Sequence, residues 1–188
     1  MTTPRRGPGS TLLVMVALVA AAVGALVLAG LPTRSPGPGP RPGPAGGGLP
    51  AGLDVTVERV VDGDTIVVSG GERVRLIGVD TPETKDPRRP VGCFGEQASN
   101  FTSSLLPVGA RVRLVGDVEQ RDRYQRLLAY AYRLPDGLFV NAELLRRGFA
   151  QVLTIPPNIA HSSEFLALSQ EARDAERGLW GACRGRGP

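Results

Sequence analysis

Four carboxylate side chains lie in two short segments whose residue types are typical of tight turns. Asp62 and Asp64 belong to the run Asp-Gly-Asp-Thr, and Asp80 and Glu83 belong to Val-Asp-Thr-Pro-Glu. Asp80 and Glu83 are separated by three positions across a proline, so a rigid corner holds two negative charges near each other. Because like charges repel, a bound cation would stabilise this arrangement. Carboxylate oxygens are ligands that Ca²⁺ prefers, so the segments predict a calcium site.

Each segment also has an ordinary structural interpretation. Asp-Gly is a common dipeptide in hairpin turns, which accounts for Asp62 and Asp64 without any ligand. Thr81 followed by Pro82 is typical of the first residues of a helix, which accounts for the second segment. For either segment alone the structural interpretation is preferred, and only the combination with other residues favours a site.

Two arginines lie at positions from which they could bind a charged oxygen substrate. Arg75 is on the expected strand that leads to Asp80, and Arg126 closes the run Asp-Arg-Tyr-Gln-Arg. A planar guanidinium binds two phosphate oxygens at once, which the ammonium group of lysine does not do. Pairing with Asp122 or Glu72 is the alternative, and for either arginine taken singly it is the better interpretation.

The residues that the chain lacks exclude several common kinds of active site. His161 is the only histidine and Lys85 the only lysine, which excludes a multi-histidine zinc site and a two-lysine phosphotransfer site and disfavours a Ser-His-Asp hydrolase. The net charge of +4 arises from four arginines that precede residue 54, and the 18 basic and 18 acidic residues beyond them balance. Affinity for a polyanion must therefore come from local clustering or from a bound cation.

The first 53 residues are predicted to lie outside the globular domain. Residues 1–10 form a basic flank with Arg5 and Arg6, and residues 11–31 contain no charged side chain. This run suits either an uncleaved transmembrane anchor or a cleaved signal peptide, and both place the rest of the chain outside the cytoplasm. Residues 32–53 are a Pro/Gly-rich linker, with seven prolines and six glycines between positions 32 and 50. The folded domain is expected at 54–183, with a tail at 184–188.

This domain is predicted to belong to the α+β class. Runs of β-branched residues separated by Asp-Gly and Gly-Gly predict strands, and apolar residues at helical spacing predict helices. Strands are expected at residues 55–61, 65–68, 73–77, 111–115 and 127–132. Helices are expected at residues 95–106, 140–147 and 163–177. The pattern favours a five-stranded OB-fold β-barrel with three α-helices, preceded by the N-terminal hydrophobic segment.

Cys93 and Cys183 are the two cysteines of the chain. An even number of cysteines in an exported protein favours a disulfide over two free thiols. The bond would close a loop of 90 residues, which on the chain-entropy model stabilises the fold by about 4–5 kcal/mol.

Taken together and in this order, the motifs resemble the staphylococcal nuclease (thermonuclease) family. The likeness begins with Asp-Gly-Asp-Thr, continues through Val-Arg-Leu-Ile-Gly-Val-Asp-Thr-Pro-Glu-Thr-Lys and includes Asp-Arg-Tyr-Gln-Arg-Leu-Leu-Ala-Tyr. It extends through residues 95–102 and 140–150 to Glu171 and Ala172, and thus covers essentially all of 54–183. The family fold is a five-stranded OB barrel with three helices, which agrees with the pattern above.

The resemblance implies a role for each part of the expected site. Asp64, Asp80 and the backbone carbonyl of Thr81 would ligate Ca²⁺, and Asp62 would have a structural role in its turn. Glu83 matches the residue that acts as a general base on the attacking water.

The positions that match the family's phosphate-binding residues imply the substrate. Arg75 and Arg126 match the two arginines that hold the scissile phosphate, and Arg123 and Tyr124 match positions beside the terminal phosphate. Single- or double-stranded DNA and RNA would be cut at the 5′ P–O bond, which leaves 3′-phosphates. The protein is expected to act as a monomer, bound to the membrane through residues 11–31 if these are uncleaved.

One segment departs from the family pattern. After Gly148 the family usually supplies aromatic residues that flank the nucleotide base, whereas residues 151–158 contain none. Base stacking contributes about 1–3 kcal/mol per base, so the resemblance predicts neither the base preference nor the affinity of this chain. The alternative function is a catalytically silent OB-fold module that binds nucleic acid or a protein partner at the cell surface.

Overall fold

The computed structural model describes residues 49–84 and 90–184. The chain divides into two units, Met1–Gly46 and Gly47–Pro188, and the described residues all belong to the second. The predictions for the basic flank at 1–10, the hydrophobic segment at 11–31 and most of the linker at 32–53 therefore lie outside the described residues. Within the described ranges, no helix is both long enough and apolar enough to cross a membrane.

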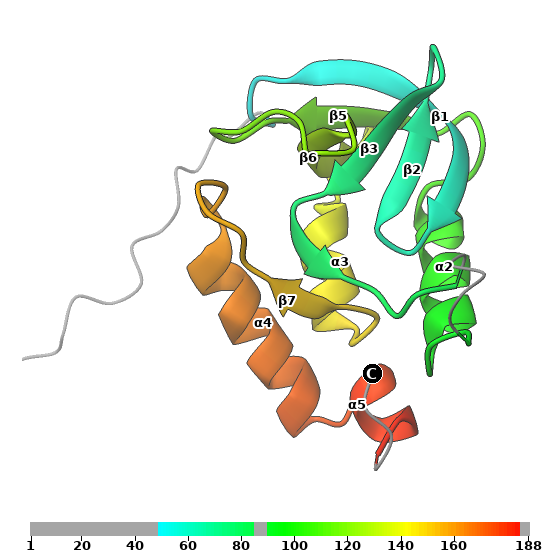
Figure 1. Ribbon diagram of the computed structural model, residues 1–188, viewed down its shortest axis with the longest axis vertical. Helices are drawn as coiled ribbons and strands as arrows, with labels where there is room; N and C mark the ends of the chain where they lie inside the picture. Colours follow the sequence, from blue (N-terminus) through cyan, green and yellow to red (C-terminus); the bar gives the residue numbers. More distant parts are fainter. Residues whose placement is uncertain (1–48, 85–89, 185–188) are drawn as a thin grey trace, which may run out of the picture. The chain divides into compact units, whose positions relative to one another are not determined.

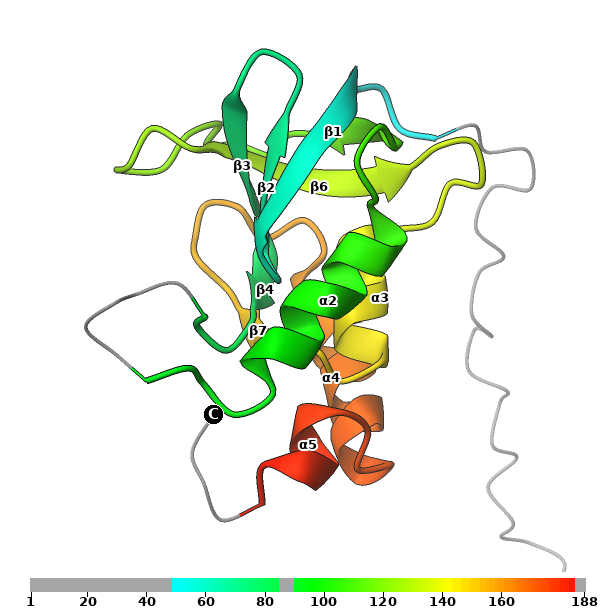
Figure 2. The same cartoon turned by 90° about the vertical axis from the view of Figure 1, so that its right-hand side faces the viewer.

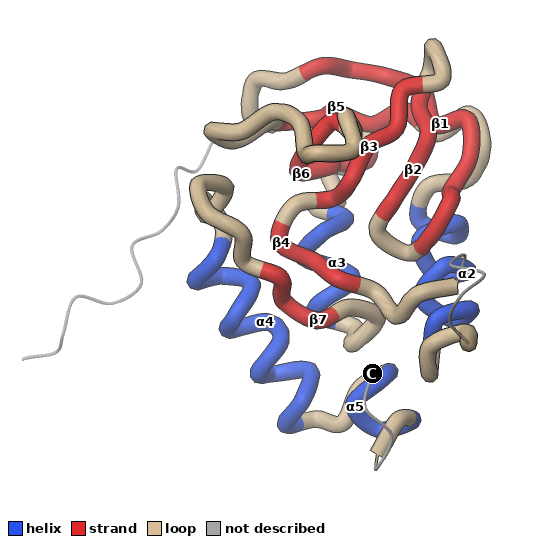
Figure 3. The backbone as a smooth tube through the Cα atoms, in the orientation of Figure 1, coloured by secondary structure: helices blue, strands red, loops and turns tan. Residues whose placement is uncertain are grey.

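A closed five-stranded barrel forms the upper part of the domain in Figures 1 and 3. Its strands, in the spatial order in which they pair, are β1 (Leu53–Asp62), β2 (Thr65–Val68), β3 (Glu72–Leu76), β6 (Leu127–Arg133) and β5 (Arg111–Val115). The neighbours are antiparallel except β3 and β6, which run parallel. The predicted five-stranded OB-type barrel is thereby confirmed.

Strand β1 closes the barrel because it belongs to two pairings. Its first residues, Leu53 to Thr56, pair with β5, and its second half pairs with β2 through register shifts that bend the strand. The inward side chains are mostly β-branched or leucine, and they fill the interior of the barrel. Fully buried members include Val57, Ile66, Val74, Leu76 and Val112.

The described part of the chain contains four helices, and Figure 2 shows them below the barrel, with α2 in front of α3. They are α2 (Gly95–Leu105), α3 (Val140–Arg146), α4 (Ser162–Asp174) and α5 (Leu179–Ala182). The first three correspond to the three predicted helices, although α4 ends at Asp174 rather than at residue 177. The short α5 was not predicted, since four residues are too few for a periodic pattern.

A second, two-stranded sheet was also missed by the sequence pattern. It consists of β4 (Gly78–Asp80) and β7 (Gln151–Leu153), which pair in antiparallel register with Asp80 opposite Gln151. Gly78 separates β4 from β3 by taking φ of +79°, a conformation that L side chains rarely adopt. A β-carbon at Gly78 would also lie 2.4 Å from the ring of Phe165. The small sheet carries Asp80 away from the barrel wall.

The folded chain begins earlier than the predicted boundary at residue 54. Leu53 is already part of β1, and Leu49 packs against the hydrophobic core. The last five residues of the predicted linker at 32–53 therefore belong to or contact the domain. Leu49 buries apolar surface against the core, whereas Leu53 is 60% exposed and joins the barrel through its strand pairing with Leu114.

Asn141 on α3 connects the barrel to the β3–β4 turn. Its side chain is fully buried, its Oδ1 accepts a hydrogen bond from Ala131 N (2.9 Å), and its Nδ2 donates to Ile77 O (2.8 Å). Both backbone groups are inside the protein, where an unpaired polar group is costly.

We therefore expect Asn141→Ala to lower the free energy of unfolding by about 2–4 kcal/mol, since each orphaned group costs about 1–3 kcal/mol. Urea denaturation measures the change. Asn100→Ala, at an exposed position of α2, serves as the matched control and should shift stability by less than about 0.5 kcal/mol. Equal losses in the two variants would contradict the assignment.

Candidate active site

The two acidic segments are joined directly by hydrogen bonds to Asp64. Its Oδ2 accepts from the backbone N–H of Thr81 (2.9 Å) and from Thr81 Oγ1 (3.1 Å), and its Oδ1 accepts from Thr65 Oγ1 (3.0 Å). Asp64 and Thr81 are both buried. A β-carbon at Gly63 would lie 2.7 Å from the Thr81 side chain, so only glycine permits this approach. The β1–β2 hairpin turn thus fixes the position of the corner that follows β4.

Residues 81–84 do not begin a helix, although Thr81 and Pro82 are typical of one. Thr81 instead uses its N–H and hydroxyl to bind Asp64, as described above. The interpretation of the second segment as a helix start is therefore wrong. The Asp-Gly turn, in contrast, is present as the tight connection between β1 and β2, with Asp62 paired to Thr65.

Arg75 links the same carboxylates through its guanidinium group. Nη1 donates to Leu76 O (2.9 Å) and Val79 O (2.7 Å), which holds the side chain against the β3–β4 kink. Nη2 donates to Asp80 Oδ1 (2.9 Å) and lies 3.3 Å from Asp64 Oδ2. The Arg75 side chain is only 12% exposed. One nitrogen therefore contacts both of the aspartates that the resemblance assigned to calcium.

Glu83 and Asp62 complete the acidic group. Thr84 connects them, because its N–H donates to Glu83 Oε1 (2.9 Å) and its hydroxyl donates to Asp62 Oδ1 (3.0 Å). Burial raises the pKa of Asp62, hydrogen bonds from Gly63 and Thr84 oppose the rise, and the charge of Asp64 and a hydrogen bond with Glu83 add to it. Burial also raises the pKa of Asp80, with Arg75 opposing the rise and the charges of Asp64 and Glu83 adding to it. Neighbouring carboxylates of like charge repel one another.

The chemistry of these donors fits a hard divalent cation. Asp64 and Asp80 both contact one Arg75 nitrogen, so the two carboxylates face the same point. Ca²⁺ takes about 6–8 oxygen ligands and accepts carboxylates, backbone carbonyls and water. Thr81 lies beside both aspartates and would offer its carbonyl. Across residues 49–84 and 90–184, however, no group of three or more His, Cys, Asp or Glu side chains is already arranged to hold a metal.

The second arginine is held by the loop between β5 and β6. Arg126 Nε donates to Asp122 Oδ2 (2.7 Å), and Asp122 Oδ1 accepts from the backbone N–H groups of Arg126 and Tyr124. Burial alone would raise the pKa of Asp122, but these hydrogen bonds lower it below its ordinary value. The pairing of Arg126 with Asp122 that the sequence offered as an alternative is thus present. It uses Nε, the inner nitrogen, and so orients the guanidinium.

Arg123 and Tyr124 lie at the tip of the same loop and contact each other. Arg123 Nη2 donates to the Tyr124 hydroxyl (2.6 Å), and its guanidinium lies 4.8 Å from the ring centroid. The Arg126 guanidinium lies 5.4 Å from the same ring. Tyr124 is 64% exposed, so the loop presents an aromatic face and two cations to solvent.

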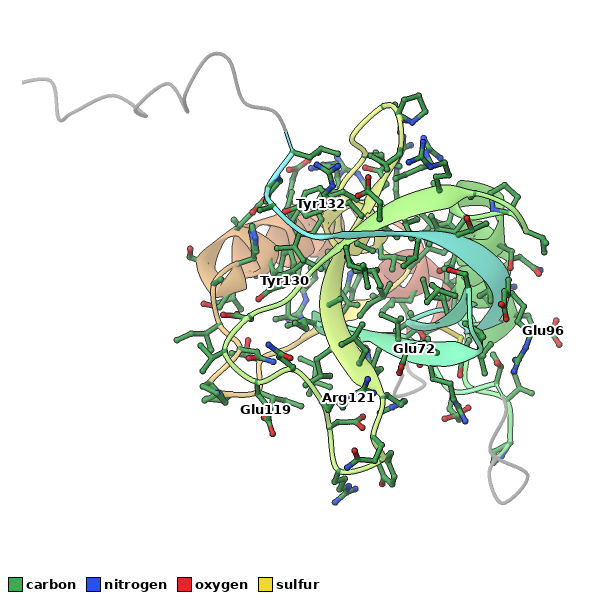
Figure 4. The ribbon with its side chains drawn as sticks, turned by 90° about the horizontal axis from the view of Figure 1, so that it is seen from above. Glu72, Glu96, Glu119, Arg121, Tyr130 and Tyr132 are labelled. Carbon is green, nitrogen blue, oxygen red and sulfur yellow. A yellow bond between two sulfur atoms is a disulfide. The ribbon has the colours of Figure 1, made fainter. Side chains whose placement is uncertain are left out.

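One pocket, with a volume of about 530 Å³, brings the two arginines together. It lies where β3, the β5–β6 loop and the segment after β7 meet; Figure 4 shows Glu119 and Arg121 on that loop, seen from above. Its charged and polar lining comprises Arg75, Glu119, Asp122, Arg123, Tyr124, Arg126 and Asn158. Its apolar lining comprises Ile77, Gly78, Leu128, Leu153 and Ile155. Asp64, Asp80 and Glu83 are not part of this lining, and Asp64 and Asp80 contact the pocket wall through Arg75.

Several residues of this pocket were not predicted from the sequence. Leu153 and Ile155 supply an aliphatic wall from the segment that lacks aromatics, and they are 37% and 58% exposed. Asn158 holds that wall in place, because its side chain accepts from Glu119 N (2.7 Å) and donates to Glu119 O (2.8 Å). The contact joins residues 39 positions apart, and no local pattern indicates it.

His161 and the cysteines lie away from this pocket. The His161 ring packs against Tyr130, Phe139 and Phe165, with centroid distances between 4.6 and 5.7 Å. This environment agrees with a structural histidine. Cys93 and Cys183 are joined by a disulfide with a Cα–Cα distance of 5.9 Å.

Comparisons with known proteins agree with this geometry. The family model described as "Staphylococcal nuclease homologue" matches residues 73–182. A thermonuclease of Staphylococcus intermedius is 43% identical over 132 residues, which cover 69% of this chain and 77% of the relative. A thermonuclease of Staphylococcus hyicus is 38% identical over 66% of this chain and 73% of its own. Endonuclease YncB of Bacillus subtilis is 39% identical over 68% of this chain and 62% of its own.

Proposed function

Because the chain belongs to the staphylococcal nuclease family, a family of nucleic-acid hydrolases, we propose that it is a calcium-dependent nuclease. It acts outside the cytoplasm on DNA and RNA and leaves 3′-phosphates. One observation carries the proposal: Arg75 and Arg126 line a single pocket, and Arg75 also contacts the carboxylates that would hold the cation. Phosphate recognition and metal binding therefore meet at one side chain.

The proposed reaction uses the two sets of groups that Arg75 joins, namely the pocket for the phosphate and the carboxylates. Arg75 and Arg126 bind the nonbridging oxygens of the scissile phosphate, and their charge stabilises the negative charge that builds up as water attacks phosphorus. Glu83 orients the attacking water and accepts its proton. The bond from phosphorus to the 5′ oxygen breaks, and that oxygen takes up a proton. Calcium, when bound, supplies further positive charge beside the phosphate.

The pocket also bears on how the nucleotide is held. Leu153 and Ile155 offer an aliphatic surface to a base, and Tyr124 lines the same pocket with an aromatic ring. Aliphatic contact buries apolar surface but lacks the stacking term of an aromatic ring, so little preference among bases is expected. The alternative of a silent OB-fold module has no observation in its favour, since Arg75, Glu83 and Arg126 are all present.

The location outside the cytoplasm rests on two features of the chain. Residues 11–31 provide an anchor or a cleaved signal, and a disulfide is stable in an oxidising compartment. Determining the N-terminal residue of the mature protein distinguishes an anchored form from a secreted one. Protein found only in the cytoplasm, even with its cysteines oxidised, would contradict both the anchored and the secreted form.

Removal of calcium should abolish cleavage. The cation then no longer compensates the repulsion among Asp64, Asp80 and Glu83, and its positive charge is missing beside the phosphate. The expected result is loss of more than about 99% of the rate on DNA and RNA in excess chelator, with recovery on adding back Ca²⁺. Circular dichroism with and without chelator controls for unfolding. Undiminished cleavage in excess chelator would remove calcium from the mechanism.

Arg126→Lys should be nearly inactive although the charge is retained, because an ammonium loses the bidentate contact and the Nε bond to Asp122. A decrease in kcat of about 10²–10³-fold is expected from losing one transition-state donor. Arg121→Lys is the matched control, since Arg121 pairs with Glu72 and is not among the pocket-lining residues. If both variants retain activity within a few-fold, Arg126 serves only to support its loop.

Substitutions of Glu83 and of Asp64 should affect different quantities, the first mainly turnover and the second mainly calcium affinity. Glu83→Gln keeps size and one acceptor but takes no proton, so turnover should fall by about 10²–10⁴-fold with calcium affinity nearly unchanged. Asp64→Asn should mainly weaken calcium binding, measured by calorimetry beside steady-state rates. Glu96→Gln, an exposed position at the start of α2 that Figure 4 labels, is the control. The opposite pattern would exchange the two roles.

A further inference from the structure

The corner that carries Glu83 is held from two sides. On the barrel side, the Thr84 hydroxyl donates to Asp62 at the end of β1. On the other side, Gly92 N donates to the backbone carbonyl of Glu83 (2.8 Å). The Glu83 side chain is exposed and its Oε1 accepts from the neighbouring Thr84 N–H (2.9 Å), so the direction of the carboxylate follows the position of this short stretch of backbone.

Two glycines make the second contact a direct packing of backbone on backbone. A β-carbon at Gly92 would lie 2.8 Å from Pro82 Cβ and 3.2 Å from Glu83 N. A β-carbon at Gly95 would lie 3.0 Å from Pro82 O and 3.3 Å from Glu83 O. Any side chain at either position would therefore push against the residue that acts as general base.

Cys93 lies between these two glycines. Its disulfide partner, Cys183, is held by the rest of the domain. Cys183 is buried directly after α5, and its N–H donates to Leu179 O (2.9 Å). Leu179 N in turn donates to Gly148 O (2.8 Å), at the turn that follows α3. Figure 2 shows α5 below the beginning of α2, the region where Cys93 lies. A hydrogen bond thus joins the α3 turn to α5, and the disulfide joins the end of α5 to the segment that packs on Glu83.

We propose that the Cys93–Cys183 disulfide is a positioning element for Glu83. It fixes Gly92 and Gly95 against the Glu83 backbone and so sets the direction of the carboxylate, in addition to stabilising the fold. Without the disulfide, the contact depends on the bond from Gly92 to Glu83, and one backbone hydrogen bond contributes little net stability by itself. No side chain caps the start of α2, and the noncovalent contacts there include the Gly95 N–H bond to Gly92 O (2.9 Å) and the packing of the Phe94 ring on Phe149, with centroids 5.3 Å apart. The inference rests on the proposed function of Glu83.

The test is a double-mutant cycle that asks whether the disulfide acts through Glu83. Cys93→Ser with Cys183→Ser is made in the parent and in the Glu83→Gln background, and kcat, KM and calcium affinity are measured below the unfolding transition of each protein. In the parent, kcat should fall about tenfold with KM and calcium affinity within twofold. In the Glu83→Gln background, the same change should alter kcat by less than twofold. Equal factors in both backgrounds, or no decrease in the parent, overturn the proposal.

A second variant leaves the disulfide intact and keeps the question answerable if the serine variant does not fold. Gly92→Ala places a methyl group against Pro82 and should lower kcat at least several-fold, again only when Glu83 is present. Gly116→Ala is the matched control, because a β-carbon there meets nothing within 4 Å. If both alanine variants behave alike, the contact at Gly92 does not position the base.

Hydrogen exchange separates a failure of this inference from a failure of the proposed function. Loss of the disulfide should speed exchange of the Gly92 amide at least tenfold and leave the amides of β2 and β3 unchanged. If the oxidised parent shows no cleavage, the proposed function is wrong whatever the exchange rates are. If the parent cleaves but exchange at Gly92 is unaffected by disulfide loss, the positioning role is wrong.

Discussion

The hydrogen bonds between Asp64 and Thr81 are the interaction on which the rest of the site depends. They join the turn after β1 to the corner after β4, two segments that the chain separates by 17 residues. Since both groups are buried, losing either partner leaves an unpaired polar atom inside the protein. Each carboxylate of the site is placed relative to this contact. Asp80 precedes Thr81 in the chain, Glu83 follows it two positions later, and Asp62 lies at the start of the turn that carries Asp64.

Arg75 combines two roles, because it pairs with acidic side chains and also lines the pocket proposed for the phosphate. Its Nη1 bonds to Leu76 O and Val79 O are satisfied by the kink at Gly78, so the guanidinium is already oriented before any ligand arrives. Its Nη2 neutralises Asp80 and Asp64, which keeps the folded protein from accumulating repulsion. Under the proposed function, a cation bound by those carboxylates would take over this electrostatic role, and the pre-oriented arginine would remain beside the pocket proposed for the phosphate.

Sequence patterns predicted the elements with enough length to show a period, and they failed for the others. The five barrel strands and three helices carry runs of β-branched residues or helical spacing. β4 and β7 have three residues each, and α5 has four, so their existence depends on tertiary pairing alone. The candidate site follows the same division. Its charged residues lie in recognisable motifs, whereas Asn158 and Ile155 join the pocket only through a contact across 39 residues.

The parallel pairing of β3 with β6 sets when the site comes into being. Val74 lies opposite Leu127 in that pairing, so Arg75 and the neighbouring Arg126 meet only after some fifty residues of intervening chain have folded back. Such distant contacts form late, because loop closure must be completed before they add stability. A newly synthesised or unfolded copy therefore holds every reacting group but cannot bring them to one phosphate. Closure of the barrel is thus a precondition for assembly of the site.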